Sequence, residues 1–142
     1  MSLPAPEPGL VIRFNYLWAR EHRMGRENAR YPRPCAIVLS LRPEPPNDEP
    51  LVLVVPITHS PPEPGAASLE LPPRIKARLG LDDARSWVIL DEANQFAWPG
   101  YDLDLNDKGE FAYGLLPPAF FDRVRQGVLD AVRARRLARV QR

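Results

Sequence analysis

Proline is the residue type that most restricts how this chain can fold. Eighteen of the 142 residues are proline, more than twice the roughly 5% share that proteins average. Proline has no backbone N–H, so it cannot donate a hydrogen bond inside a helix or a central strand. Its clusters at 43–50 and 61–64 therefore mark connections. The sequence favours a β-rich fold with long loops.

The apolar segments between these connections are short and predict strands. Residues 10–16 mix apolar and polar positions, whereas 35–41 and 51–58 are nearly continuous apolar runs, as in a barrel core. Pro56 would interrupt a ladder, so the 51–58 strand is expected to turn or reach an edge there. Further strands are predicted at 69–71, 86–90, 94–98 and 111–114, with 86–90 and 94–98 forming either two strands or one bent strand.

Two segments have helical patterns. Residues 72–80 predict a short helix with proline at its start and Gly80 at its end. A longer helix begins at positions 117–118 and carries arginines at 133, 135, 136, 139 and 142 in its expected last turns. Its apolar stripe consists of Phe120, Phe121, Val124, Val128, Ala131 and Val132. The polar segment 17–32 is expected to be a long mobile loop, with or without a helical turn.

Together these elements predict a mainly β fold with a C-terminal helix, arranged as a small, partly open barrel. The length fits one domain over 8–140, after an N-terminal tail of residues 1–7. No apolar stretch approaches the ~20 residues that cross a membrane, and the N-terminus lacks the order of a signal peptide. A cytoplasmic protein with no membrane partner is therefore expected.

The net charge of +1 hides an uneven distribution. Residues 1–42 carry seven Arg against three Glu, and residues 119–142 carry seven Arg against two Asp. The middle, 43–118, carries thirteen acidic groups against five basic ones. The basic ends either neutralise the acidic middle or meet to form an Arg-rich surface suited to phosphates.

Few residues offer chemistry of their own. Cys35 is the only cysteine and lies in the apolar run 35–39, so a buried, inert thiol is expected. The chain has only two histidines, His22 and His59, and no metal-ligand spacing, phosphate-cradling glycine loop or nucleophile elbow. No metal and no cofactor are expected, and composition alone leaves the function open.

Three segments, in order, resemble one family. Residues 8–14 (PGLVIRF) lead through a Gly-containing loop to 33–40 (RPCAIVLS), which is similar to the "PGdvv" and "RPavvlS" strands of MazF/PemK toxins. Residues 54–58 (VVPIT) resemble the family's "vvPiT", and 88–96 (VILDEANQF) its "vllDqvrti". The resemblance covers most of 8–140, including the terminal helix.

That resemblance implies an SH3-like barrel that forms a homodimer. It implies the toxin of a type II toxin–antitoxin system, an endoribonuclease of the mRNA interferase kind that is silenced by a cognate antitoxin protein. It also implies metal-independent cleavage of single-stranded RNA, in which the ribose 2′-OH attacks the neighbouring phosphate and leaves a cyclic phosphate and a 5′-OH.

The resemblance assigns catalytic roles to Arg33, Thr58 and Asp91. Arg33 matches the Arg at the loop-to-strand junction, Thr58 the Thr that ends the second strand, and Asp91 an Asp with a catalytic part in some PemK-type members. An Arg stays protonated and can clamp the charge of a crowded phosphate, and a Thr hydroxyl can add a hydrogen bond. The alternatives are an Arg33 that pairs with an acidic neighbour and a Thr58 that only ends a strand.

RNA-binding roles fall to Arg26, Trp18 and His59. Arg26 stands where some family members place a His after the loop glycine, and Trp18 is expected to be an exposed aromatic in a polar loop. His59 is a candidate for proton transfer, or else a solvated loop residue. Other aromatics are expected either to stack on unpaired bases or to lie in the core: Tyr16, Trp98 and Tyr101 in the first group, Trp87 and Phe96 in the second.

A different class of function fits the same pattern. A noncatalytic SH3-like module would bind RNA or a partner peptide through the same basic face without cutting it. Incubation with single-stranded RNA in excess chelator separates the two hypotheses.

Overall fold

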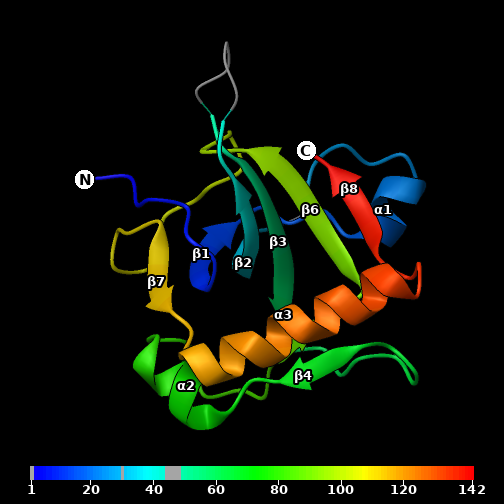
Figure 1. Cartoon of the computed structure of the whole chain (residues 1–142). Helices are drawn as coiled ribbons and strands as arrows, with labels where there is room; N and C mark the ends of the chain where they lie inside the picture. The colour runs from blue at the N-terminus through cyan, green and yellow to red at the C-terminus, as the bar shows by residue number, and fades with distance from the viewer. Residues whose placement is uncertain (1, 30, 44–48) are drawn as a thin grey trace.

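The computed structural model describes residues 2–29, 31–43 and 49–142. Its elements follow the chain in this order: β1 (Leu10–Phe14), α1 (Ala19–Arg23), β2 (Arg33–Leu41), β3 (Leu51–Thr58), β4 (Ser68–Glu70), α2 (Pro73–Arg78), β5 (Trp87–Ile89), β6 (Glu92–Ala97), β7 (Ala112–Leu115), α3 (Pro118–Arg133) and β8 (Ala138–Gln141). Figure 1 shows the strands fanning out on one side of α3, with β4 and α2 on the other.

The strands form one open, mainly antiparallel sheet that branches at β3. The path runs β4-β5-β3-β2-β1-β7, while β6 pairs with β3 and carries β8 on its other side. Every pair is antiparallel except β6 with β8. The expectation of a mainly β fold with a C-terminal helix is confirmed.

Pro56 lies where β3 changes neighbours. The first half of β3 pairs with β6 through Leu51–Val54, and its end pairs with β5 at Ile57 and Thr58. On its other side the ladder of β3 with β2 ends at this point, with Pro56 opposite Cys35. A residue without an N–H is tolerated where no neighbour continues the ladder. The strand therefore passes through Pro56 and presents Thr58 at its end.

The sheet is buried on both faces, because alternate side chains of each strand point to opposite sides. One face packs under α3, where Val11, Ala36 and Val55 of the sheet cluster with Phe120 and Val124 of the helix. The other face holds a second cluster that includes Ile12, Cys35, Val54, Tyr16 and Phe96. Burial of the Cys35 thiol and of the Phe96 ring was expected and is confirmed.

The C-terminal helix is shorter than the sequence suggested. Its stripe is buried from Phe120 to Ala131, but Val132 is half exposed. The helix ends at Arg133, Arg135 takes a positive φ of 55°, and the chain turns back into β8. The sequence hid this strand because, within Ala138–Gln141, only Val140 is a buried apolar residue.

The segment 17–32, expected as a loop with or without a helical turn, contains such a turn, α1 over Ala19–Arg23. Leu17 and Ala19 are buried against Ala138 and Val140 of β8. The buried side-chain amide of Asn94 explains this order, because it accepts a bond from the Leu17 N–H (2.9 Å) and donates to the Leu17 carbonyl (2.8 Å). A short helix, α1, follows.

The two basic ends of the chain therefore meet, but not as a bare Arg-rich surface. Arg26 forms an ion pair with Glu21 at 3.4 Å, and Arg142 with Asp102 at 3.0 Å. The Arg142–Asp102 pair joins an end to the acidic middle, as the neutralising interpretation has it, whereas Arg26 is paired within the N-terminal end.

The remaining predicted elements are found with small changes of bounds. The segments 86–90 and 94–98 are two strands, β5 and β6, and the helix of 72–80 is α2. Most of the proline-rich connection 43–50, namely positions 44–48, lies outside the described residues. Among the helices of the described chain, none is long and apolar enough to cross a membrane.

Candidate functional site

Antiparallel pairing places Arg33 and Thr58 at the same edge of the sheet. Arg33 begins β2 and Thr58 ends β3, and the ladder between these strands ends with Cys35 opposite Pro56, close to both residues in the chain. Phe14 at the end of β1 is paired with Arg33, and Trp87 of β5 with Thr58. Two pockets open on either side of this edge, and both residues line both of them.

We call the larger one the Trp18 pocket. Its volume is about 700 Å³, and its lining mixes aromatic, basic and acidic side chains. The residues that matter here are Tyr16, Trp18, Arg20, Glu21, Arg26, Tyr31, Arg33, Thr58, Ser60, Asp91 and Glu92. Five of the six sequence-predicted site residues therefore line one pocket, and His59 is the exception.

The Arg33 guanidinium is held by aromatic rings. Its Cζ lies 4.8 Å from the centre of the Trp18 ring and 5.0 Å from that of Tyr31, within the range of a cation–π contact. No carboxylate of the described residues lies within ion-pair distance of it. Its Nε is buried without a hydrogen-bond partner. The positive charge of this guanidinium is therefore left for an anion that enters either pocket.

Trp18 is not the exposed aromatic that the sequence suggested. Only 8% of its surface is exposed, and the guanidiniums of Arg33 and Arg20 lie over its ring. A ring covered in this way positions arginines and is not free to stack on a base. Tyr16 and Trp98 are buried too, whereas Tyr101 is fully exposed.

Thr58 is buried but keeps a proton to donate. Its Oγ1 accepts a hydrogen bond from the Ser60 N–H at 3.1 Å, which fixes the hydroxyl at the pocket edge. A hydroxyl that accepts one bond still has its own O–H. Within the described chain that O–H has no acceptor, so it can donate to a ligand oxygen.

The carboxylates of the Trp18 pocket support the surrounding backbone. Asp91 accepts a bond from the Ala67 N–H at 3.3 Å. Glu92 accepts from the Tyr16 hydroxyl and from the Ala19 N–H, both at 3.0 Å. Burial raises the pKa of Glu92 despite these two bonds. Burial, together with the charge of Glu92, raises the pKa of Tyr16, so its hydroxyl remains a donor.

Arg26 is less available than the sequence suggested. It is ion-paired with Glu21, whose carboxylate also accepts from the Trp18 N–H at 3.3 Å. This contact fixes the pocket wall and neutralises the charge of Arg26. Its predicted role in binding RNA is weakened by that pairing.

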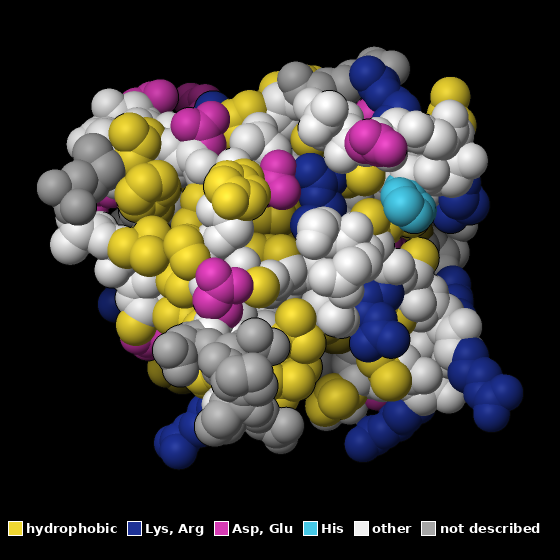
Figure 2. Space-filling model, turned by 90° about the horizontal axis from the view of Figure 1, so that it is seen from above, with side chains coloured by type: hydrophobic (Ala, Val, Ile, Leu, Met, Phe, Trp, Pro, Cys, Tyr) yellow, Lys and Arg dark blue, Asp and Glu magenta, His cyan; other side chains and the backbone are white. Residues whose placement is uncertain are grey.

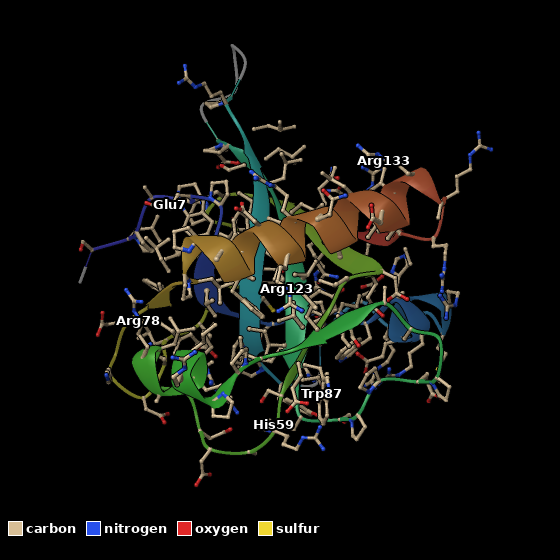
Figure 3. The ribbon with its side chains drawn as sticks, turned by 60° about the horizontal axis from the view of Figure 1, so that its bottom comes forward. Glu7, His59, Arg78, Trp87, Arg123 and Arg133 are labelled. Atoms are coloured by element: carbon tan, nitrogen blue, oxygen red, sulfur yellow. The ribbon has the colours of Figure 1, made fainter. Side chains whose placement is uncertain are left out.

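The second pocket, the His59 pocket, has a volume of about 380 Å³. It shares Tyr31, Arg33, Thr58 and Ser60 with the Trp18 pocket. Its own lining includes Arg13, His59, Lys76, Asp82, Ser86, Asp107 and Tyr113. Figure 3 shows His59 close to Trp87 at one side of the molecule, while Arg133 lies at the far end of α3.

A chain of polar contacts runs from His59 into the protein. The His59 Nε2 lies 2.8 Å from Asp82 Oδ2, and the buried Lys76 Nζ lies 2.7 Å from Asp82 Oδ1. Lys76 also contacts the Ser86 hydroxyl at 2.7 Å and the Ala84 carbonyl. Burial opposes ionisation of Asp82, but the bonds and charges of Lys76 and His59 prevail and lower its pKa.

Arg13 is a second arginine without a carboxylate partner. It projects from β1, next to the start of β2, and its Nη1 donates to the Tyr113 hydroxyl at 3.2 Å. Of the described carboxylates, none is within ion-pair distance of its guanidinium. Arg13 and Arg33 therefore bring two uncompensated positive charges to the His59 pocket.

Sequence reasoning missed Arg13, Tyr31, Lys76 and Asp82. Arg13 had a signal, since it is the one charged residue in an otherwise apolar strand. Asp82 had none, because it lies 23 positions after His59 in the chain and only the placement of α2 and the loop after it brings the two together.

On the face in Figure 2, the charges do not form one extended field, because basic and acidic side chains are interspersed among hydrophobic ones. On this face, recognition of an anion depends on individually placed arginines. In the described ranges, no group of three or more His, Cys, Asp or Glu side chains is arranged to hold a metal ion.

No family model, curated protein or solved structure matches this chain. The observations that bear on its function are therefore the two pockets and the sequence resemblance.

Proposed function

We propose that this chain is a metal-independent endoribonuclease of the MazF/PemK toxin kind that cleaves single-stranded RNA. The observation that carries the proposal is Arg33. Its guanidinium is held between two rings at the junction of two pockets and has no carboxylate partner in the described chain. A structural arginine in such a position would be paired, whereas a phosphate-binding one waits for its ligand.

The reaction needs stabilisation of a crowded phosphate. In the proposed step the ribose 2′-oxygen attacks the adjacent phosphorus, the bond to the 5′-oxygen breaks, and a 2′,3′-cyclic phosphate and a 5′-hydroxyl result. Arg33 and Arg13 neutralise the charge that builds up on the non-bridging oxygens, and Thr58 donates its hydroxyl to one of them. In this proposal Asp91 lies on the other side of the edge, in the Trp18 pocket.

The architecture is compatible with that family. An open antiparallel sheet whose strands curve round one core, with a helix across the other, supports an SH3-like barrel. We propose a two-fold homodimer and inhibition by an antitoxin segment, which would occupy the Trp18 pocket, where acidic and apolar side chains meet arginines.

The proposal is tested with single-stranded RNA in excess chelator. We expect cleavage to persist, with 5′-hydroxyl product ends. Arg33→Ala should lower the rate by on the order of a hundredfold or more, and Arg33→Lys should recover little, because a point charge lacks the guanidinium fork. Arg133→Ala, at an exposed site on the end of α3, is the matched control and should cut like the parent.

Two results would overturn the proposal. A parent protein that binds RNA without cutting it would favour the noncatalytic module. A folded Arg33→Ala that cuts at the parental rate would remove Arg33 from the site. Light scattering at tens of micromolar tests the dimer separately, because a moderately tight pair persists at that concentration.

A further inference from the structure

The proposed mechanism leaves one proton without an acceptor. The 2′-hydroxyl must lose its proton as it attacks, and neither arginine can take it, because a guanidinium stays protonated. The Thr58 hydroxyl already accepts a bond from the Ser60 N–H, and its own O–H is left to donate, so it is not the base. A base must therefore lie within reach of Arg33 and Thr58. Of the chain's two histidines, His59 lines the same pocket as both.

The contact with Asp82 fixes which nitrogen of His59 can act. Its Nε2 lies 2.8 Å from a carboxylate oxygen, and a carboxylate is only an acceptor when ionised. The neutral imidazole therefore carries its proton on Nε2, which leaves the lone pair on Nδ1. That is the tautomer that a general base needs, and a carboxylate partner is the usual means of selecting it.

Asp82 is itself held from inside the protein. Lys76, whose side chain is 5% exposed, binds its other oxygen at 2.7 Å. The hydroxyl of Ser86 and the Ala84 carbonyl fix Lys76 in turn. The imidazole, in contrast, is 61% exposed. A rigid support behind an accessible ring is what a proton-transfer group requires.

We propose that His59 is the general base of this site and that Asp82, anchored by Lys76, is its positioning residue. This deepens the proposed ribonuclease function and depends on it. Nδ1 of His59 takes the proton of the 2′-hydroxyl while the 2′-oxygen bonds to phosphorus. The P–O5′ bond breaks, and the departing 5′-oxygen takes a proton from water. His59 then returns its proton to solvent.

The first experiment is chemical rescue. His59→Ala should cut RNA on the order of a hundredfold more slowly than the parent, and free imidazole should restore part of that rate. His22→Ala is the matched control, because His22 is exposed in α1 and lies outside both pockets. It should cut normally and ignore imidazole. A His59→Ala that melts like the parent and cuts at the parental rate would overturn the proposal, as would a slow variant that imidazole does not accelerate.

The second experiment reads the tautomer without any activity. Long-range ¹H–¹⁵N correlation spectra of the parent should show the proton of neutral His59 on Nε2, with His22→Ala supplying the assignment. Asp82→Asn should weaken that preference and lower kcat with little change in KM, and Asp82→Glu should recover part of the loss. A proton on Nδ1 in the parent would overturn the proposed role.

The two experiments distinguish failure of the proposed ribonuclease function from failure of the role proposed for His59. If the parent does not cut RNA at all, the proposed function fails, whatever the tautomer. If the parent cuts and His59→Ala cuts equally well, the ribonuclease proposal stands and the assignment of the base is wrong.

Discussion

The Trp18 pocket and the His59 pocket share one edge but use their charges differently. In the Trp18 pocket, Arg26 is already neutralised by Glu21, and two further carboxylates, Asp91 and Glu92, support backbone N–H groups. In the His59 pocket, Arg13 has no carboxylate partner within the described residues. The acids of the first pocket hold the structure, while Arg13 of the second pocket, unlike its neighbour Lys76, has no carboxylate partner among the described residues.

This difference suggests that the two pockets beside Arg33 bind different parts of a ligand. A phosphate fits the side where Arg13, Arg33 and Thr58 converge. The larger Trp18 pocket has apolar walls and paired charges, and therefore suits a nucleobase of the RNA or a segment of a partner protein. The two pockets should then respond independently to mutation, which the following predictions test.

The largest expected effect concerns the support of the Trp18 pocket. Asn94→Ala removes the partner of both backbone groups of Leu17, and each buried unsatisfied group costs about 1–3 kcal/mol. We expect a loss of stability of about 2–4 kcal/mol, measured by urea denaturation. The tautomer signal of His59 should not move, because Asn94 makes no contact with the second pocket. A changed signal would mean that the pockets form one cooperative unit.

The next prediction compares two arginines. Arg13→Ala should weaken RNA binding and cleavage by roughly ten- to a hundredfold, because an interaction with a charged group contributes about 1.5–3 kcal/mol. Arg26→Ala should change both by less than about twofold, because its charge is already paired at a partly exposed site. Filter binding at two salt concentrations measures both. If Arg13→Ala and Arg26→Ala lost RNA binding and cleavage to the same extent, the phosphate would not be bound on the His59 side alone.

Much of the fold could be predicted from the sequence, because its signals are local. The apolar runs at 35–41 and 51–58 and the stripe on α3 gave β2, β3 and the helix. β8 could not be found, because a strand with a single buried residue has no periodic pattern. The order of 17–19 was missed for another reason: it depends on the side chain of Asn94, which lies 77 positions from Leu17.

The candidate site was predicted in part. Arg33 and Thr58 do line the same two pockets, because antiparallel strands bring the start of β2 and the end of β3 to one edge. Trp18 was placed in the right pocket with the wrong exposure, since no local pattern shows that two guanidiniums cover its ring. The partners of His59 come from the α2 region, which no motif connects to it.

The smallest expected effect contrasts one carboxylate from each pocket. Burial raises the pKa of Glu92, so the folded chain holds that proton more tightly than the unfolded chain does. Lys76 and His59 outweigh the burial of Asp82 and lower its pKa, so folding releases that proton. The two groups must therefore contribute to stability with opposite dependence on pH.

For Glu92, the ionised form is the one that folding disfavours. As the pH rises above about 4.3, the ordinary pKa of a glutamate, the unfolded chain ionises first and the parent loses stability. Glu92→Gln keeps an oxygen to accept from Tyr16 and Ala19 but has no proton to lose. The stability of the parent relative to this variant should therefore fall as the pH rises from about 4 through the raised pKa of Glu92 in the folded protein.

For Asp82, the sign is reversed. Its contribution is complete above about pH 4, the ordinary range of an aspartate, and is lost as the pH falls through its lowered value in the folded protein. Parent stability relative to Asp82→Asn should thus decline on acidification, although solvent weakens the effect because the side chain is 52% exposed. Thermal melts of the three proteins across pH 3–8 measure both slopes. If the stability of the parent changed with pH in the same direction relative to both variants, the carboxylates of the two pockets would not differ in their electrostatic environment. The assignment of the phosphate to the His59 pocket would then lose its electrostatic basis.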